Sequence, residues 1–259
     1  MSNAPATPTT VAQLMNILVT DPGRPRITWY GDAGERVELS GAVLVNWISK
    51  TTNLLVEEFD AAPGCRTVID LPPHWRTAVW ALGALSTGAT VLLPADDGSA
   101  PDGRPADVVV TTRPAAFTGD VVAVALPALA RRFDGDLPPG AIDAAGAVMT
   151  YADQILWTPD TDPSEPALVA PAATAPVQGV LHGDLLAWAV RAAPAPGARA
   201  LLDGGLPVLD ALAAMIGTWA TGGSVVLASP ATVAALLADP ARRERLRAQE
   251  GVTHDLLGE

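Results

Sequence analysis

Residues 168–186 read LVAPAATAPVQGVLHGDLL, and this stretch decides how the rest of the chain is interpreted. A short apolar run begins it, a loop rich in proline and alanine follows, and a helical apolar pattern ends it. The order of strand, loop and helix is typical of α/β proteins that hold a phosphate group at the start of a helix. The stretch therefore predicts an α/β fold with a ligand loop, or the remains of one, between a strand and a helix.

Outside this stretch, strand-length apolar runs alternate with helical apolar spacing. We expect helices at 11–19, 41–58, 74–86, 182–193, 207–220, 230–238 and 240–249, and a helical turn at 127–133. We expect strands at 26–31, 36–39, 67–71, 89–93, 107–112, 121–126, 199–203 and 224–228, with another beginning at 252–254. This succession indicates mainly parallel sheets flanked by helices. Because residues 134–166 are rich in Asp, Pro and Gly, we place a boundary there between two α/β subdomains, 1–163 and 164–259.

The loop resembles the phosphate loop of the adenylate-forming enzymes, which include acyl-CoA synthetases, adenylation domains and luciferases. That family carries a run close to T-S-G-T-T-G-x-P-K-G, and the matching positions here are Thr174, Gly179 and the exit 180–182. Residues 64–94, GCRTVIDLPPHWRTAVWALGALSTGATVLLP, are similar to another segment of the family. A weaker similarity extends over nearly the whole chain, as in a small actinobacterial family distantly similar to these enzymes. The resemblance implies the fold of the N-terminal part of an adenylate-forming enzyme.

Several residues that would bind phosphate in such a loop are replaced. The family's two loop glycines align with Ala172 and Ala175, and a left-handed backbone costs a non-glycine residue about 1–2 kcal/mol. Pro171 and Pro176 have no N–H to donate, and the family's lysine aligns with the neutral Gln178. We therefore expect a degenerate phosphate loop. Its vestigial residues are Thr174, Gln178, Gly179 and His182.

Three residues at or beyond the loop each have two interpretations. His182 either approaches the crevice at the carboxyl ends of the strands, where open α/β sheets bind ligands, or simply begins a helix. Asp184 and Asp210 stand where the family commonly has histidines. Two carboxylates can act as general acid and base, but acidic residues at helix starts are also favoured by the helix dipole. We favour the helix-start interpretation for all three and predict no catalytic residue.

The composition excludes several classes of partner. A net charge of −12 disfavours binding to nucleic acid or to an anionic membrane surface. The apolar span 206–228 is interrupted by Pro207, Asp210 and a Gly-Gly pair, so it is too short for a membrane helix. Cys65 is the only cysteine and no Cys/His metal spacing occurs, which predicts no internal disulfide, no metal site and no bound cofactor. The N-terminus lacks the features of a secretory signal, so we expect a cytoplasmic protein.

Three hypotheses for the function follow from the resemblance. The family's adenine-site motif, ribose-binding aspartate and lysine-bearing C-terminal domain come later than the segments matched here, and none is found in this sequence. The first hypothesis is a non-catalytic remnant, a pseudoenzyme that binds an unknown partner. The second is a binder of a nucleotide or acyl molecule in the inherited crevice, and the third is one half of a split adenylating ligase. Of the seven tryptophans, we expect most in the core and any exposed one to mark a partner surface.

Overall fold

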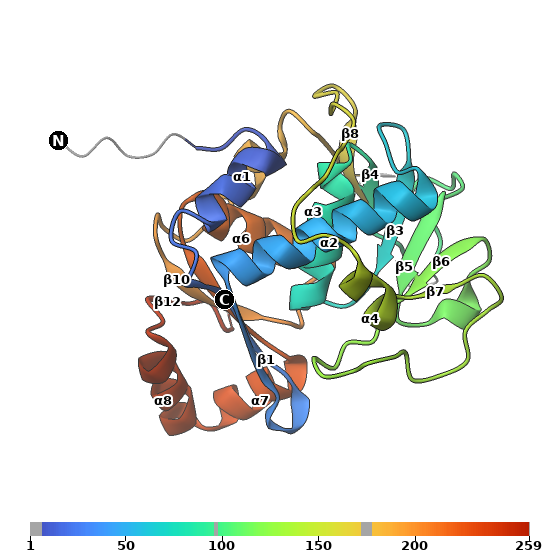
Figure 1. Cartoon of the computed structure of the whole chain (residues 1–259). Helices are drawn as coiled ribbons and strands as arrows, with labels where there is room; N and C mark the ends of the chain where they lie inside the picture. Colours follow the sequence, from blue (N-terminus) through green and yellow to red (C-terminus); the bar gives the residue numbers. More distant parts are fainter. Residues whose placement is uncertain (1–6, 96–97, 172–177, 259) are drawn as a thin grey trace. The chain divides into compact units, whose positions relative to one another are not determined.

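The computed structural model describes residues 7–95, 98–171 and 178–258, and the chain folds as two compact units (Figure 1). Unit 1 is formed by both ends of the chain, Met1–Ala42 and Gly183–Glu259, and unit 2 by Val43–His182. The sequence instead placed one boundary after residue 163. The divisions differ because β1 (Pro25–Tyr30) of the N-terminal segment pairs with β11 (Ser224–Ala228) in one sheet, and a pairing of such distant segments leaves no local signal.

The sheet of unit 1 has the strand order β12-β10-β11-β1-β2. The first four strands are parallel, and β2 is antiparallel to β1. The other elements of this unit are α1 (Val11–Leu18), η1 (Asp32–Gly34), β2 (Arg36–Ser40), α5 (Leu185–Val190), β10 (Arg199–Asp203), α6 (Val208–Ala220), α7 (Pro230–Ala238), α8 (Pro240–Glu250) and β12 (His254–Asp255).

Helices α7 and α8 cover one face of this sheet, where Leu201 and Val226 of the strands form one buried cluster with Leu236 and Leu246 of the helices. Side chains two residues apart on a strand share a face, so Arg199 lies on the same face as Leu201. Helix α6 also packs against β10 and β11, and α5 packs against α6. A Cβ at Gly217 would lie 2.1 Å from the carbonyl oxygen of Ala189, so the close approach of α5 and α6 requires glycine there.

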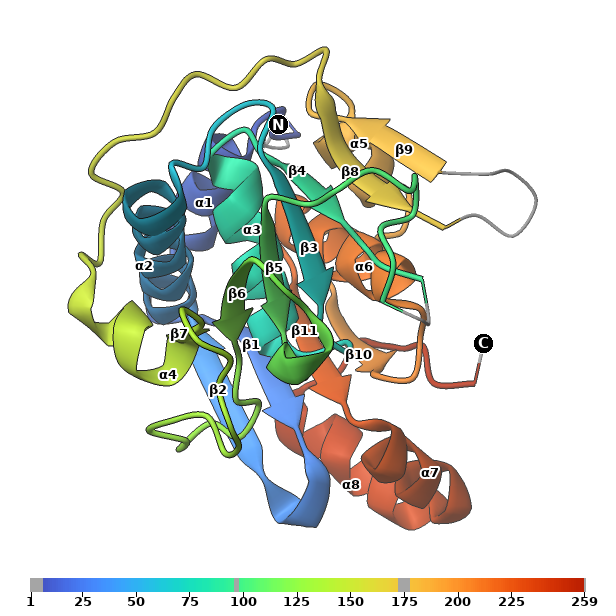
Figure 2. The ribbon, with the colours of Figure 1, turned by 90° about the vertical axis from the view of Figure 1, so that its right-hand side faces the viewer.

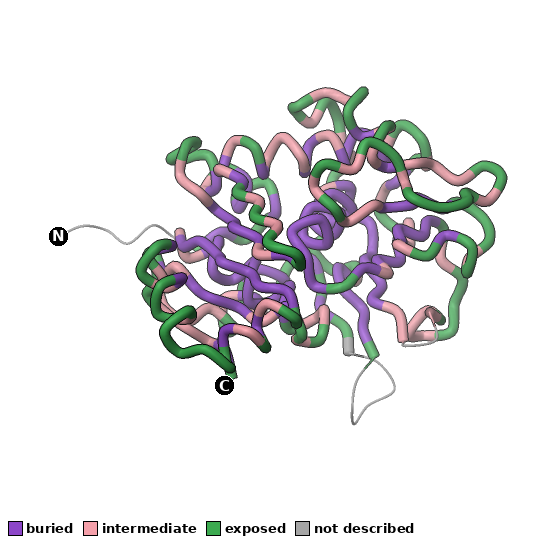
Figure 3. The backbone as a smooth tube through the Cα atoms, turned by 90° about the horizontal axis from the view of Figure 1, so that it is seen from below, coloured by how far each residue is buried: buried purple, intermediate pink, exposed green. Residues whose placement is uncertain are grey.

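The sheet of unit 2 has the order β7-β6-β5-β3-β4-β8-β9, parallel except for the edge strand β9. Strands β4 and β5 are buried along their whole length, as expected for parallel strands covered on both faces. Figure 3 shows the buried stretches of the backbone in purple and the exposed ones in green. The elements are α2 (Gly41–Phe59), β3 (Arg66–Asp70), α3 (Trp75–Ser86), β4 (Thr90–Leu92), β5 (Val108–Thr111), η2 (Pro114–Ala116), β6 (Asp120–Ala123), β7 (Ile142–Asp143), α4 (Ala144–Ala147), η3 (Val148–Thr150), β8 (Pro166–Ala170) and β9 (Gln178–Leu181).

The predicted class, α/β with mainly parallel sheets flanked by helices, is confirmed. Three local predictions are wrong. Residues 127–133 form turns and no helix, the helix expected at 182–193 is limited to α5, and β9 occupies positions assigned to the loop. Within the described ranges, no helix is both long and apolar enough to cross a membrane.

Candidate functional site

The predicted phosphate loop joins two antiparallel strands at the edge of the unit 2 sheet (Figure 2). Gln178 pairs with Ala170 and Gly179 with Val169, so the chain turns back along β8 before it reaches a helix. Thr174 lies outside the described residues. Gly179 is exposed without a left-handed backbone, and a Cβ there would meet nothing nearer than the Leu168 carbonyl oxygen, at 4.0 Å. The backbone around position 179 therefore does not require glycine.

His182 lies at the end of the sheet opposite to the expected crevice. Because β9 is antiparallel, it returns the chain to the amino end of β8, where the His182 N–H donates to the Glu165 carbonyl at 3.0 Å. The side chain is buried, and its Nε2 has no hydrogen-bond partner among the described residues. Burial lowers the pKa of His182, although the backbone of Ala89 and Gly88 and two nearby carboxylates oppose the shift. His182 therefore does not reach the carboxyl ends of the strands, and the favoured prediction that it begins a helix is also wrong, because it lies between β9 and α5.

Asp184 and Asp210 belong to unit 1 and lie at helix starts. Asp184 directly precedes α5, and its carbonyl accepts from the Trp188 N–H at 2.8 Å. Asp210 is exposed in the first turn of α6, where the helix dipole favours a negative charge. Neither carboxylate has a hydrogen-bond or ion-pair partner among the described residues, and nothing there links the two as an acid–base pair. The same residues hold no group of three or more His, Cys, Asp or Glu side chains placed to bind a metal ion.

The carboxyl ends of β3 and β5 carry a polar cluster that the sequence analysis missed. Strand β4 lies on one side of β3 and β5 on the other, so the strand order reverses here, and this is the position where α/β sheets commonly bind ligands. Asp70 accepts from the Thr111 hydroxyl at 2.5 Å and from Arg113 Nε and Nη2 at 2.9 and 3.0 Å. This carboxylate is therefore already neutralised by the protein, and the cluster joins the ends of two strands.

The segment after β3 buries a histidine beside a stacked arginine. His74 is the N-cap of α3, where its Nδ1 accepts from the Arg76 N–H at 3.2 Å. The Arg76 guanidinium lies over the Trp75 ring at 4.2 Å and the Trp47 ring at 5.4 Å from the centroids. Burial and the charge of Arg76 lower the pKa of His74 to about 3. His74 is therefore a neutral capping residue at physiological pH.

A segment beside α2 presents large apolar side chains to solvent. Asn53 of α2 binds it at three points, because its Nδ2 donates to the carbonyls of residues 152 and 154 and its Oδ1 accepts from the Leu156 N–H. Lys50 adds a bond to the Tyr151 carbonyl and an ion pair with Asp153, both through Nζ. On this anchored backbone, Leu156 and Trp157 are 70% and 65% exposed. We call this pair the Leu156–Trp157 surface.

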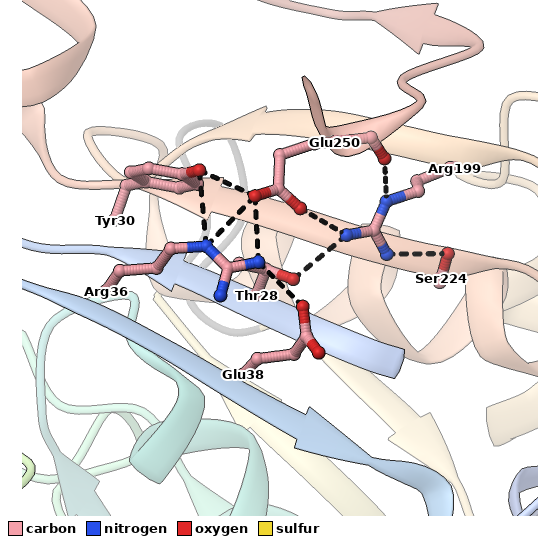
Figure 4. A network of polar contacts seen from close by, with 7 residues as sticks. All are labelled: Thr28, Tyr30, Arg36, Glu38, Arg199, Ser224 and Glu250. Atoms are coloured by element: carbon pink, nitrogen blue, oxygen red, sulfur yellow. Dashed lines mark hydrogen bonds and ion pairs between the residues drawn. The ribbon is translucent and has the colours of Figure 1, made fainter. Parts of the chain in front are cut away.

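A charged network lies in unit 1 on the sheet face that α7 and α8 cover (Figure 4). Its centre is Glu250, the last residue of α8, whose side chain is only 3% exposed. Arg36 Nη2 lies 2.9 Å from Glu250 Oε1, and Arg199 Nη2 donates to Oε2 at 2.6 Å. Tyr30 donates its hydroxyl to Oε1 at 2.6 Å. One buried carboxylate thus receives donors from three different strands.

The network holds Glu250 in its ionised form. Burial alone would raise the pKa of Glu250, but hydrogen bonds from Tyr30, Arg199 and Arg36 hold it below its usual value. Arg199 also donates to the hydroxyls of Thr28 at 3.0 Å and Ser224 at 3.2 Å. The sequence did not predict this network because its members are far apart along the chain. The available signal was Arg199, a charged residue that begins a strand with an apolar centre.

A cavity of about 470 Å³ lies beside this network, at the amino ends of β1, β10 and β11. We call it the arginine pocket. The residues of its wall include Arg24, Arg36, Glu38, Arg199, Ser224, Glu250 and Thr253. Arg36 donates to Glu38 at 2.7 Å. Both ion-paired arginines therefore already contact carboxylates of the pocket wall.

No family model matches this sequence. A protein of Mycobacterium tuberculosis (strain ATCC 25618 / H37Rv) named "TIGR03089 family protein" is 37% identical over 265 residues. The alignment covers 96% of this chain and 99% of that protein.

The fold is that of the N-terminal part of adenylate-forming enzymes. The acyl-CoA synthetase of Brucella canis superimposes with a TM-score of 0.71 and 18% identity, over 98% of this chain and 48% of the synthetase. The amide bond synthetase McbA of Marinactinospora thermotolerans gives 0.65 and 17%, over 95% of this chain and 48% of that enzyme. The chain thus spans about half the length of these solved synthetases. At such identities the likeness concerns the fold alone.

Proposed function

This chain belongs to the TIGR03089 family, and we propose that it is a non-catalytic interaction protein built on the fold of an adenylate-forming enzyme. In this proposal the β8–β9 hairpin is a degenerate phosphate loop, and the protein acts by binding a partner protein. The observation that carries the proposal is the Leu156–Trp157 surface, which is apolar, exposed and held on a fixed backbone.

The supply of cations argues against adenylation. Transfer of an adenylyl group needs positive charge close to the reacting phosphate. The hairpin carries the neutral Gln178 where the resembling loops carry lysine. Lys50, the only lysine in the sequence, is bound by the Tyr151 carbonyl and by Asp153. The only lysine side chain of the sequence therefore anchors the segment that presents the apolar surface.

The exposure of Leu156 and Trp157 favours a partner protein. Large apolar side chains beside one another at an exposed site are typical of protein interaction surfaces, and tryptophan is enriched among their energetically dominant residues. Asn53 and Lys50 hold the backbone beneath this pair in place. A surface fixed before binding loses less conformational entropy when a partner docks.

ATP–pyrophosphate exchange with a pool of carboxylic acids tests the absence of catalysis. We expect exchange at the level of a reaction without protein. Clear exchange that depends on one acid would overturn the proposal.

Thermal denaturation with ATP, AMP, CoA and acyl-adenylates tests the second hypothesis, that of a small-molecule binder. A ligand at 100 times its Kd adds about 2.7 kcal/mol of stability. Stabilisation by one of these compounds would favour a small-molecule binder instead.

Co-purification from the native host tests the interaction. We compare the wild-type chain with the variant Leu156→Ser/Trp157→Ala, and use Leu237→Ser as the control, because Leu237 of α7 is also 47% exposed. A protein retained by the wild type and by the control, but lost by the double variant, supports the Leu156–Trp157 surface. Equal retention by all three chains contradicts it. A retained protein that carries adenine-site motifs would identify a split ligase.

A further inference from the structure

The arginine pocket of unit 1 contains more positive charge than its own carboxylates neutralise. Arg24, Arg36 and Arg199 contribute three positive charges to its wall, while Glu38 and Glu250 contribute two negative ones. Arg36 and Arg199 are ion-paired to Glu250, and Arg36 also to Glu38. The guanidinium of Arg24 has no hydrogen-bond or ion-pair partner within the described ranges. In a chain with a net charge of −12, this local excess is unusual.

Arg24 lies near a second, buried cation, Arg26. The Arg26 guanidinium donates only to carbonyl oxygens, those of Ile17, Leu18 and the turn at 222–223. Burial lowers the pKa of Arg26 and the positive charge of Arg24 lowers it further, while the charge of Asp21 opposes the shift. The Arg24 side chain therefore lies near a second cation, and it has no hydrogen-bond or ion-pair partner within the described ranges.

The size and the wall of the pocket indicate what it can hold. A volume of about 470 Å³ falls in the usual range for small-molecule sites, and it is much larger than a bare phosphate requires. The wall is polar, with the hydroxyls of Ser224 and Thr253 beside the arginines. Guanidinium groups bind carboxylate and phosphate oxygens through paired, charge-assisted hydrogen bonds. Arg24 is the residue whose donors are available for such a contact.

We propose that the arginine pocket binds a small organic anion, and that Arg24 contacts its carboxylate or phosphate group. Arg36 and Arg199, held in position by Glu250, supply the positive field around that group. This site lies at the amino ends of the unit 1 strands, and it goes beyond the proposed function, because a partner surface in unit 2 needs no ligand here. A negative result for one proposal therefore does not contradict the other.

Calorimetric titration of the full chain tests the pocket with named probes. Inorganic phosphate and glycerol 3-phosphate form the phosphate arm, citrate and succinate form the carboxylate arm, and sodium chloride at matched ionic strength is the control. We expect saturable binding in one arm and about tenfold weaker binding of the same probe by Arg24→Gln. Arg24→Lys, which keeps the positive charge, is expected to lose less affinity for that probe. Arg132→Gln, an exposed arginine of unit 2, is the matched control and should bind as the wild type does.

Two results would overturn the proposal. The first is that none of the four probes gives more heat of binding than sodium chloride at the same ionic strength. The second is binding that Arg24→Gln leaves unchanged, because the anion would then lie elsewhere. Arg24 has no described partner to lose, so Arg24→Gln should fold and melt no lower than the wild type. This makes a loss of binding by that variant attributable to the pocket.

Discussion

Glu250 of unit 1 and the two buried histidines of unit 2 are accommodated in opposite ways. Unit 1 buries Glu250 as a charged carboxylate, surrounded by Arg36, Arg199 and Tyr30. Unit 2 buries His74 and His182, whose pKa values are lowered by burial, so that both are neutral at physiological pH. The cost of desolvating a charge is thus offset by ion pairing at Glu250 and avoided by neutralisation at the two histidines.

This difference affects which of the two units can bind an anion. A buried ion pair keeps a strong local field and holds its guanidinium groups in fixed positions beside a cavity. A buried neutral histidine leaves no such field, and the described part of the β8–β9 hairpin adds no cation of its own. Anion chemistry is therefore expected in unit 1, although the resemblance to adenylate-forming enzymes points to the hairpin of unit 2.

The largest effect is expected from Glu250→Gln. The variant removes the carboxylate that Arg36 and Arg199 share. Removing one partner of a buried ion pair typically costs about 3–5 kcal/mol. We expect a loss of about 3 kcal/mol in the free energy of unfolding, measured by urea denaturation. Glu244→Gln is the matched control, because Glu244 pairs with Arg247 on an exposed helix face and should contribute less than about 1 kcal/mol. Equal losses in both variants would show that the network does not stabilise unit 1.

Protonation of His74 is expected to make the free energy of unfolding depend on pH. Its pKa is about 3 in the folded chain and about 6.5 when unfolded, so the unfolded chain takes up the proton first. The contribution of His74 is complete above pH 6.5 and is lost progressively as the pH falls toward 3. At pH 5 the loss relative to pH 8 is about 2 kcal/mol.

His74→Asn tests that assignment. Asparagine is a favoured N-cap, so the variant keeps an acceptor at the start of α3 and removes the titration. We expect a shallower decrease of stability between pH 8 and pH 5, with His182 contributing a remaining slope. An unchanged slope in His74→Asn would contradict the assignment.

Tyr30→Phe sharpens the comparison within unit 1. The variant removes one hydroxyl that donates to Glu250 at 2.6 Å and leaves both arginines in place. Hydrogen bonds to charged groups contribute about 1.5–3 kcal/mol, and partial exposure of Tyr30 places the expected loss near the lower end. Urea denaturation at pH 7 measures it. A loss as large as that of Glu250→Gln would mean that the aromatic hydroxyl, and not the ion pairs, dominates the network.

The elements that the sequence predicted correctly are those with a local signal, either an apolar pattern or a proline at the helix start. Helix α2 shows apolar residues at helical spacing, and α7 and α8 each begin at a proline, so their starts were readable. The division into units was not readable, because it depends on the pairing of β1 with β11 across about 200 residues of chain. Strand β9 was missed because residues 178–181 are short and follow a proline-rich loop, and only pairing with β8 makes them a strand.

The candidate sites were harder to predict for the same reason. The predicted phosphate loop was placed by a motif, but that motif contains no information on the direction of β9, which takes His182 to the amino end of β8. The arginine pocket assembles Arg36, Arg199 and Glu250, each of which resembles an ordinary surface charge in the sequence. Asp184 and Asp210 stayed at helix starts, where local dipole reasoning had placed them.

The smallest effect is expected from Gln178→Lys, which adds a cation to the unit that lacks one at its hairpin. Position 178 begins β9, at the edge of the sheet, and single substitutions at such edges usually change stability by less than about 0.5 kcal/mol. ATP–pyrophosphate exchange should stay at background, because a single ammonium group does not replace the backbone N–H donors that are missing at Pro171 and Pro176. Glu38→Gln, which raises the positive charge of the arginine pocket instead, should strengthen binding of a phosphate or carboxylate probe there. If Gln178→Lys alone gave measurable exchange, the hairpin would be a working phosphate site lacking one charge, and the contrast between the two units would reverse.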